Sequence, residues 1–265
     1  MDLEAVKKAL LGTITLLAAA QLTWGSVIFD DFNLALASQH FNQPSLSYSG
    51  TTAGITTDGS SVSTWDTTTG DGILEGTGMD FLHVIKSTSA STVRVRWLSG
   101  LGTPANNTSF TASGSASGND GRIGLYLKAP ASDGSTWVVS LNLDAPANTS
   151  ATMSWSGDQT IIADGAWHLY EWQVNTTSWG QVPGLGGQTA GVLTAGTHTF
   201  DSIYIRNLST LAASSTYDFY VDFLAKTDDN STSVSTLLPV VPEPSSLTLG
   251  LLGGFGLLVA WFRRR

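Results

Sequence analysis

Four aspartates are the residues of this chain best suited to binding a metal ion. Asp30 and Asp31 follow a short hydrophobic run, and Asp218 and Asp222 lie in an alternating segment far along the chain. Calcium prefers several oxygen ligands from carboxylates and backbone carbonyls. If the first and last strands of the domain lie side by side, these four side chains are expected to form a structural calcium site. The alternative, that they are solvated strand ends or turn formers, stays open.

Aromatic residues offer a second kind of chemistry, because a sugar ring stacks on tryptophan or tyrosine while polar neighbours bind its hydroxyls. Trp65 and Trp179 lie among Thr, Ser, Asn and Gly, which predicts exposed positions in loops. Tyr126, Tyr170 and Arg96 are predicted on the faces of strands. These five residues are the candidate ligand contacts.

The sequence contains few residue patterns that support catalysis. Glycoside hydrolysis usually needs two facing carboxylic acids, and Glu75 and Glu171, the only glutamates between the two hydrophobic ends of the chain, occur in unrelated contexts. There is no H-E-x-x-H or G-x-S-x-G motif and no phosphate-binding loop. The lack of cysteine excludes thiol catalysis and cysteine-bound zinc. No catalytic residue is predicted.

The chain is acidic, with a net charge of −9 over 265 residues. Nucleic-acid binding depends on the neutralisation of phosphates by Lys and Arg, so no nucleic-acid partner is expected. Because disulfides are impossible, the stability of the domain has to come from burial in β-sheets.

Alternation of apolar and polar residues predicts β-strands through most of the body. In 92–98, Val93, Val95 and Trp97 share one face, while Arg94 and Arg96 share the other. Further strands are expected at 27–32, 79–86, 167–174, 202–206 and 217–224.

Two neighbouring strands and one loop are also predicted. Residues 123–128 and 137–143 alternate on either side of Asp133-Gly134, which predicts a β-hairpin. The stretch 106–120, rich in Asn, Ser and Gly, is expected to be an exposed loop.

Many short strands without an amphipathic helix indicate an all-β fold, an antiparallel β-sandwich over 26–226, followed by a polar linker at 227–241. The hydrophobic first strand, the long early loops and the segment Asp164–Trp172 before two closing strands resemble the lectin-like and carbohydrate-binding jelly rolls. This resemblance implies a jelly-roll-like sandwich and carbohydrate binding.

An apolar segment precedes this domain. Lys7 and Lys8 lead into an apolar core that ends in small residues at 18–20, which is typical of a secretory signal peptide over 1–25. An uncleaved N-terminal anchor is the alternative.

A second apolar segment follows the domain. An uncharged run rich in Gly and Leu at 246–262 is preceded by Pro242, Glu243 and Pro244 and followed by Arg263, Arg264 and Arg265. An apolar run with a cationic end predicts a transmembrane helix whose tip stays in the cytoplasm. The run is short for a permanent anchor, which needs about 20 residues, and a plain anchor is the alternative.

These three parts, in this order over 242–265, resemble the PEP-CTERM sorting signal of bacterial exported proteins. The resemblance implies recognition of Pro-Glu-Pro by an exosortase-type membrane protease. It also implies transit through the inner membrane and delivery to the cell surface or to an extracellular polysaccharide matrix.

The sequence therefore favours an exported, non-catalytic surface or matrix protein that is associated with exopolysaccharide. A carbohydrate-binding module with a specific glycan ligand is the second hypothesis, and a secreted polysaccharide-degrading enzyme is the third.

Overall fold

A computed structural model describes residues 26–32, 52–56, 62–66, 72–73, 79–88, 90, 92–98, 109–131, 134–144, 153–181 and 190–238. The expected signal peptide at 1–25 and the expected sorting signal at 242–265, with its transmembrane segment, lie outside these residues. Within the described part, no helix is both long enough and apolar enough to span a bilayer.

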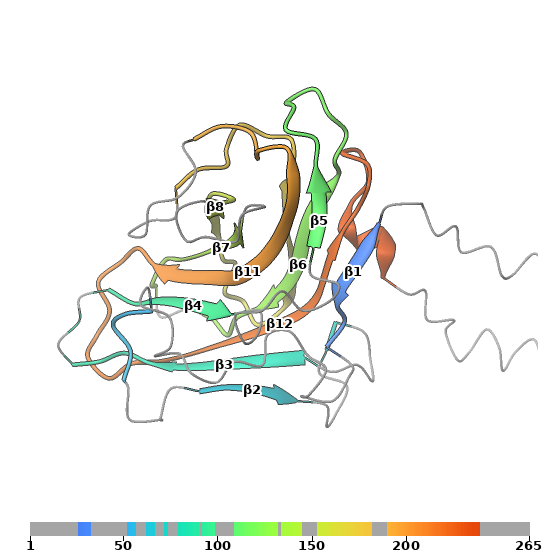
Figure 1. Ribbon diagram of the computed structural model, residues 1–265. Coiled ribbons are helices and arrows are strands. Elements are labelled where there is room, and N and C mark those ends of the chain that lie inside the picture. The colour runs from blue at the N-terminus through green and yellow to red at the C-terminus, as the bar shows by residue number, and fades with distance from the viewer. Residues whose placement is uncertain are drawn as a thin grey trace, which may run out of the picture.

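The described strands form two sheets, and the chain passes from one sheet to the other several times. They are β1 (Val27–Asp30), β2 (Val62–Asp66), β3 (Met79–Ile85), β4 (Arg94–Leu98), β5 (Ser109–Ala112), β6 (Arg122–Lys128), β7 (Trp137–Asp144), β8 (Ser154–Trp155), β9 (Gln159–Thr160), β10 (Trp167–Gln173), β11 (Gly196–Asn207) and β12 (Thr216–Lys226). Sheet A has the order β10-β6-β12-β3-β2, with β1 also paired to β12. Sheet B has the order β4-β11-β7-β8, with β5 paired to β11 and β9 paired to β7 (Figure 1). The predicted antiparallel β-sandwich is confirmed.

The first and last described strands lie side by side, as expected. Along one edge, β12 pairs first with β3 and then with β1, where Val27 lies opposite Lys226. The ladder is interrupted between Asp222 and Ala225, and Phe223 adopts a left-handed backbone with φ of 51°. Because of this bulge, Phe223 packs on the outer side of sheet A with Ala225, while Leu224 stays in the core between the sheets.

The core between the sheets is built from the inward positions of the alternating strands. Val95 and Trp97 of β4 meet Leu125 and Leu127 of β6 in one buried cluster. Trp97 is fully buried and Trp137 is 4% exposed, as their alternation with aliphatic residues predicts. Each large apolar side chain buried in this way stabilises the fold by roughly 1.5–3 kcal/mol.

The predicted hairpin of residues 123–143 is wrong. Both strands exist, but β6 lies in sheet A and β7 lies in sheet B, so the chain passes between the layers instead of turning back on itself. Gly134, with φ of +94°, still lies in the connection where a turn residue was expected. Alternation shows which face of a strand is buried but not which sheet the strand joins, because both sheets of a sandwich bury one face against the core.

The loop expected at 106–120 contains a strand. In β5, Phe110 and Ala112 are buried, and the strand pairs with β11 so that Ala112 lies opposite Gly196. Phe110 packs edge-on against Phe29, with 6.4 Å between the ring centroids. Phe110 and Ala112 therefore anchor this otherwise polar stretch to the core.

The chain beyond β12 folds onto sheet A, although a linker was predicted from 227. The amide of Thr227 donates to the carbonyl of Arg122 at 2.9 Å. The short 3-10 helix η3 (Val234–Leu237) follows, and its Val234 is fully buried against the cluster of Phe223 and Ala225. The Glu171 carboxylate accepts from the Ser233 hydroxyl at 2.9 Å and from the Val234 amide. The folded domain therefore extends to Leu238.

Candidate functional site

The side of sheet B that points away from the core carries a cluster of polar and aromatic residues centred on Tyr204. In β11, Ile203 and Ile205 point into the core, so Tyr204 and Arg206 point outward. Residues directly opposite in an antiparallel pair share a face, which extends this surface to the neighbouring strands. We call this surface the arginine–tyrosine face and define it by Arg94, Arg96, Asn142, Trp155, Tyr204 and Arg206. The strand at its centre, β11, follows a strongly curved path (Figure 1).

Tyr204 is fully buried although it faces away from the core. It forms a small cluster with Met153 and with the half-buried Trp155. Burial raises the pKa of the Tyr204 hydroxyl, and the positive charges of Arg94 and Arg206 oppose this rise. The phenol group therefore lies among guanidinium groups that come from two adjacent strands.

Carboxylates hold two of these arginines in place. Arg96 binds Asp201 through two nitrogens, and its Nε lies 2.8 Å from Asp201 Oδ2. Arg206 binds Asp158 in the same two-nitrogen manner and lies over the Trp155 ring, 5.8 Å from the centroid. Paired hydrogen bonds of this kind fix the plane of the guanidinium. Both arginines are therefore set in orientation before any ligand arrives.

A hydrogen-bonded chain links the first of these pairs to Asn142. The Asn142 amide nitrogen donates to Ser202 Oγ at 3.0 Å, and Ser202 Oγ donates to Asp201 Oδ2 at 2.5 Å. Asp144, on the same face of β7 as Asn142, has its pKa raised to about 6, mainly by burial and further by the charge of Asp201, while Arg96 opposes the rise.

Three buried polar atoms of this face have no hydrogen-bond partner among the described residues: Arg94 Nε, Asn142 Oδ1 and Trp155 Nε1. Asn142 is fully buried, and the other two residues are half-buried. A buried polar group without a partner costs about 1–3 kcal/mol. Two donors and one acceptor of this face are therefore left unsatisfied among the described residues.

Of the predicted ligand contacts, Arg96 lies on this face and two others are buried elsewhere. Trp179 is fully buried in the core, and its Nε1 donates to the Gln173 carbonyl at 3.2 Å, so the prediction of an exposed loop residue is wrong. Tyr170 is 3% exposed, and its hydroxyl accepts from the Ile162 amide at 2.8 Å, so it is not an open sheet-face residue.

The two remaining predicted contacts lie in sheet A. Tyr126 is half-buried on the outer face, beside the hydrophobic cluster that contains Val234. Trp65 lies in β2, a strand instead of the expected loop, where its backbone pairs opposite Asp80. Neither residue joins the arginine–tyrosine face.

The structure does not gather the four predicted calcium ligands. Asp30 lies opposite Leu224, and its carboxylate accepts from the Phe32 amide at 2.8 Å, while Asp31 follows β1. Asp222 accepts from the Ile73 amide at 2.8 Å, and Asp218 contacts His83 Nδ1 at 2.6 Å. Among the described residues, no three His, Asp or Glu side chains are grouped so that they could hold a metal ion.

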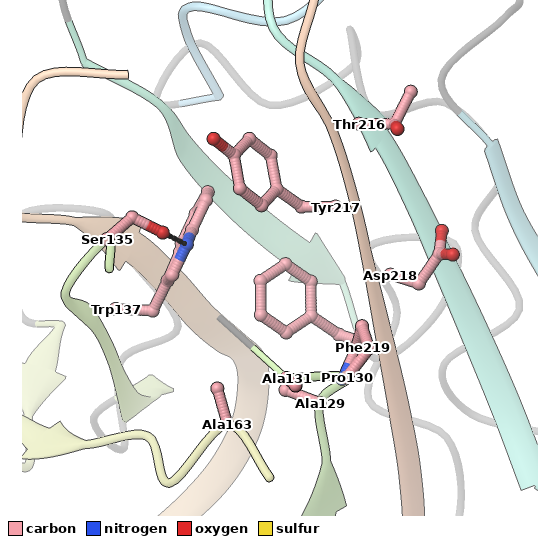
Figure 2. A pocket seen from close by; sticks show the side chains of 10 residues that line it. All are labelled: Ala129, Pro130, Ala131, Ser135, Trp137, Ala163, Thr216, Tyr217, Asp218 and Phe219. Atoms are coloured by element: carbon pink, nitrogen blue, oxygen red, sulfur yellow. Dashed lines mark hydrogen bonds between the residues drawn. The ribbon is translucent and has the colours of Figure 1, made fainter. Parts of the chain in front are cut away.

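A pocket of ≈ 110 Å³ lies at one end of the sandwich (Figure 2). Its aromatic wall is formed by Trp137, Tyr217 and Phe219, whereas Asp218 and Thr216 point away from these rings. The Trp137 ring lies 4.7 Å from that of Tyr217 and 5.0 Å from that of Phe219. Ligand pockets usually occupy about 300 Å³ or more. This pocket is therefore better explained as a gap at the end of the core.

A row of aromatic residues crosses the outer face of sheet A. Lys128 Nζ lies 4.9 Å from the Trp167 ring centroid and 4.6 Å from that of Tyr220, and Tyr220 stacks on Phe81 at 5.0 Å. Each of these rings therefore contacts a neighbour in the row, and all three are partly buried. Cross-strand contacts of this kind stabilise a sheet by about 0.2–1 kcal/mol per pair. We therefore assign the row to stability.

The sequence contained a signal for the arginine–tyrosine face that the predictions missed. Tyr204 and Arg206 alternate with Ile203 and Ile205, as Arg94 and Arg96 alternate with the apolar residues of β4. Two strands with basic residues at their outward positions indicate a shared charged surface if the strands pair. That pairing, between β11 and β4, is known only from the structure.

No protein family matches the sequence, and no curated protein matches it. Several solved structures are distantly similar to it. The family 11 carbohydrate-binding module of the cellulosomal cellulase Lic26A-Cel5E of Clostridium thermocellum is 13% identical, covers 79% of this chain and 98% of that one, and gives a TM-score of 0.40. A family 30 carbohydrate-binding module covers 88% of this chain and 97% of that one at 13% identity, with a TM-score of 0.41. The likeness is one of fold.

Proposed function

We propose that this protein is a non-catalytic carbohydrate-binding protein whose glycan ligand lies on the arginine–tyrosine face. The observation that carries the proposal is the set of three buried, unpartnered polar atoms on Arg94, Asn142 and Trp155. A sugar hydroxyl both donates and accepts, so neighbouring hydroxyls of one glycan can satisfy the two donors and the acceptor.

The rest of the face is suited to holding a sugar in one orientation. Trp155 keeps part of its surface open and offers apolar contact to a pyranose ring. Arg96 and Arg206 are already fixed by Asp201 and Asp158, so little side-chain freedom is lost when they contact a ligand. The face is therefore preorganised around the unpartnered atoms.

Binding by the full-length chain can be tested by affinity electrophoresis and calorimetry against a panel of soluble polysaccharides. Trp155→Ala and Asn142→Ala are expected to weaken binding at least about tenfold, which corresponds to ~1.4 kcal/mol. The control is Leu208→Ala, because Leu208 is 54% exposed just after β11 and outside the face. Thermal melts establish that each variant is folded. Equal affinity for the Trp155→Ala and Leu208→Ala proteins would contradict the proposal.

One observation bears on the alternative that the protein degrades polysaccharide. Asp144 has a raised pKa and interacts with Asp201, a pattern seen in pairs of catalytic carboxylates. Both oxygens of Asp201, however, accept from Arg96, so Asp201 is not a free second carboxylate beside Asp144 among the described residues. Release of reducing ends from any polysaccharide that the protein binds would reverse this assignment.

We further propose that the protein is exported and sorted to the cell surface or the extracellular matrix of a bacterium. Support comes from the sequence alone, namely the signal-peptide pattern at 1–25 and the Pro-Glu-Pro, apolar and arginine elements of 242–265. An exosortase-type protease is the partner in processing, and exopolysaccharide is the natural source of a glycan at that location.

A further inference from the structure

We propose that the glycan bound by the arginine–tyrosine face is acidic and that a sugar carboxylate pairs with Arg94. This inference rests on the proposed function and adds the chemical class of the ligand. It comes from Arg94, the one arginine of this face that has no carboxylate partner among the described residues.

The three guanidinium groups of the face differ in their partners. Arg96 is neutralised by Asp201, and Arg206 is neutralised by Asp158. Among the described residues no carboxylate pairs with Arg94, and its Nε is buried without a hydrogen-bond partner. Arg94 is therefore the arginine of this face that lacks a carboxylate partner among the described residues, in a chain whose net charge is −9.

Arg94 is held so that it cannot easily leave the face. Its backbone amide and carbonyl both bond to Ala53, at 3.0 Å and 2.9 Å, and on the opposite side it is the partner of Arg206 in the β4–β11 ladder. The influence of its charge on the pKa of Tyr204 places the guanidinium near that phenol. Both edges of the local backbone are therefore fixed.

The chemistry of the guanidinium selects a carboxylate over a hydroxyl. A sugar hydroxyl can accept from Arg94 Nε, but the charge of the half-buried group then stays unpaired, which is costly. A carboxylate accepts two parallel hydrogen bonds from the planar fork and neutralises it.

The test compares acidic polysaccharides with neutral forms of the same polymers, so that only the charge differs. Alginate, polygalacturonate and hyaluronan are each paired with their carboxyl-reduced forms and titrated into the full-length chain. At least one acidic polymer is expected to bind at least about tenfold more tightly than its reduced form. Arg94→Gln is expected to abolish this preference, so that the acidic and reduced forms bind with affinities within about twofold of each other.

Arg94→Lys serves as the matched variant, because it keeps the charge and loses the fork. We expect it to retain part of the preference for the acidic polymer, whereas Arg94→Gln retains none. If Arg94→Gln fails to fold, as judged by its thermal melt, the salt dependence of binding by the wild-type and Arg94→Lys proteins takes its place. Weaker binding at high salt for acidic polymers alone is then the expected result.

The outcomes separate this inference from the proposed function. Equal binding of acidic and reduced polymers, or tight binding of neutral glucans alone, overturns the acidic class while carbohydrate binding stands. Tighter binding of sulfated than of carboxylated polymers overturns the proposal that a carboxylate is the group that pairs with Arg94. Binding to no acidic or neutral polysaccharide overturns both proposals.

Discussion

At the scale of single residues, Asp144 is expected to make stability depend on pH. Its pKa is raised to about 6, so the folded protein binds the proton more tightly than the unfolded chain does. The stabilisation is fully present below pH ~4 and is lost as the pH rises through about 6. Urea titrations should show the free energy of unfolding falling by on the order of 2 kcal/mol between pH 4.5 and 7.5, since each unit of pKa difference is worth ~1.4 kcal/mol.

The matched variants are Asp144→Asn and Asp164→Asn. The first removes the titrating group, so the decline in stability should be largely abolished. Asp164 is exposed, and hydrogen bonds from the Ala166 amide and then from His168 lower its pKa. Its carboxyl therefore titrates below the pH range of the experiment. The Asp164→Asn protein should show the same decline in the free energy of unfolding as the wild type. An unchanged decline in the Asp144→Asn protein would show that another group is responsible.

The environment of single residues was predicted well where periodicity applied and poorly where it did not. Trp97 and Trp137 alternate with aliphatic residues, and both are buried as predicted. Trp179 has polar neighbours, yet the backbone of its segment bridges to Gly191, and its ring enters the core. Local composition describes only the neighbours of a residue in the sequence, whereas burial depends on where the chain passes through the sandwich.

At the scale of elements, the segment after β12 is predicted to be part of the folded domain. Val234 of η3 is fully buried against Phe223 and Ala225, so Val234→Asp places a charge in an apolar contact. We expect a loss of about 2–4 kcal/mol, the range of large single-residue effects. Thermal and urea unfolding of the full-length protein measure this loss.

The same helix supplies the control. Thr236 is exposed two residues further on, so Thr236→Asp should change stability by less than about 0.5 kcal/mol. If Val234→Asp were equally neutral, the segment would behave as the free linker that composition indicates. Composition cannot predict this docking, because the polar residues 227–233 are accommodated by hydrogen bonds such as that from the Gly121 amide to Asn230 Oδ1, at 2.9 Å.

The elements themselves were largely predictable, but their partners were not. Alternation located β4, β6, β10 and β12 to within a few residues. It did not reveal that β6 and β7 lie in different sheets, because an apolar face fits the core from either side. The arginine–tyrosine face was not predicted for the same reason. Its residues come from β4, β7, β8 and β11 and are brought together only by strand pairing.

At the scale of the whole molecule, the two outer surfaces of the sandwich have different roles. On sheet A, Lys128 lies over the Trp167 ring, Tyr220 stacks on Phe81, and η3 covers a neighbouring hydrophobic cluster. On sheet B, the outward residues include buried polar atoms without partners. The unpartnered atoms of sheet B lie where we propose that a glycan binds, whereas the contacts on sheet A pair outward side chains with one another.

Binding and sorting are predicted to be separable, because the proposed sorting signal begins after the last described residue of the folded domain. In a bacterium with an exosortase-type protease, Glu243→Ala should leave full-length protein in the inner membrane, since the Pro-Glu-Pro element is the proposed recognition site. Cell fractionation and immunoblotting measure this, with Ser245→Ala as the neighbouring control. The purified variant should keep wild-type affinity for the glycan, because Glu243 is not part of the arginine–tyrosine face. Normal surface delivery of Glu243→Ala would instead favour a plain membrane anchor.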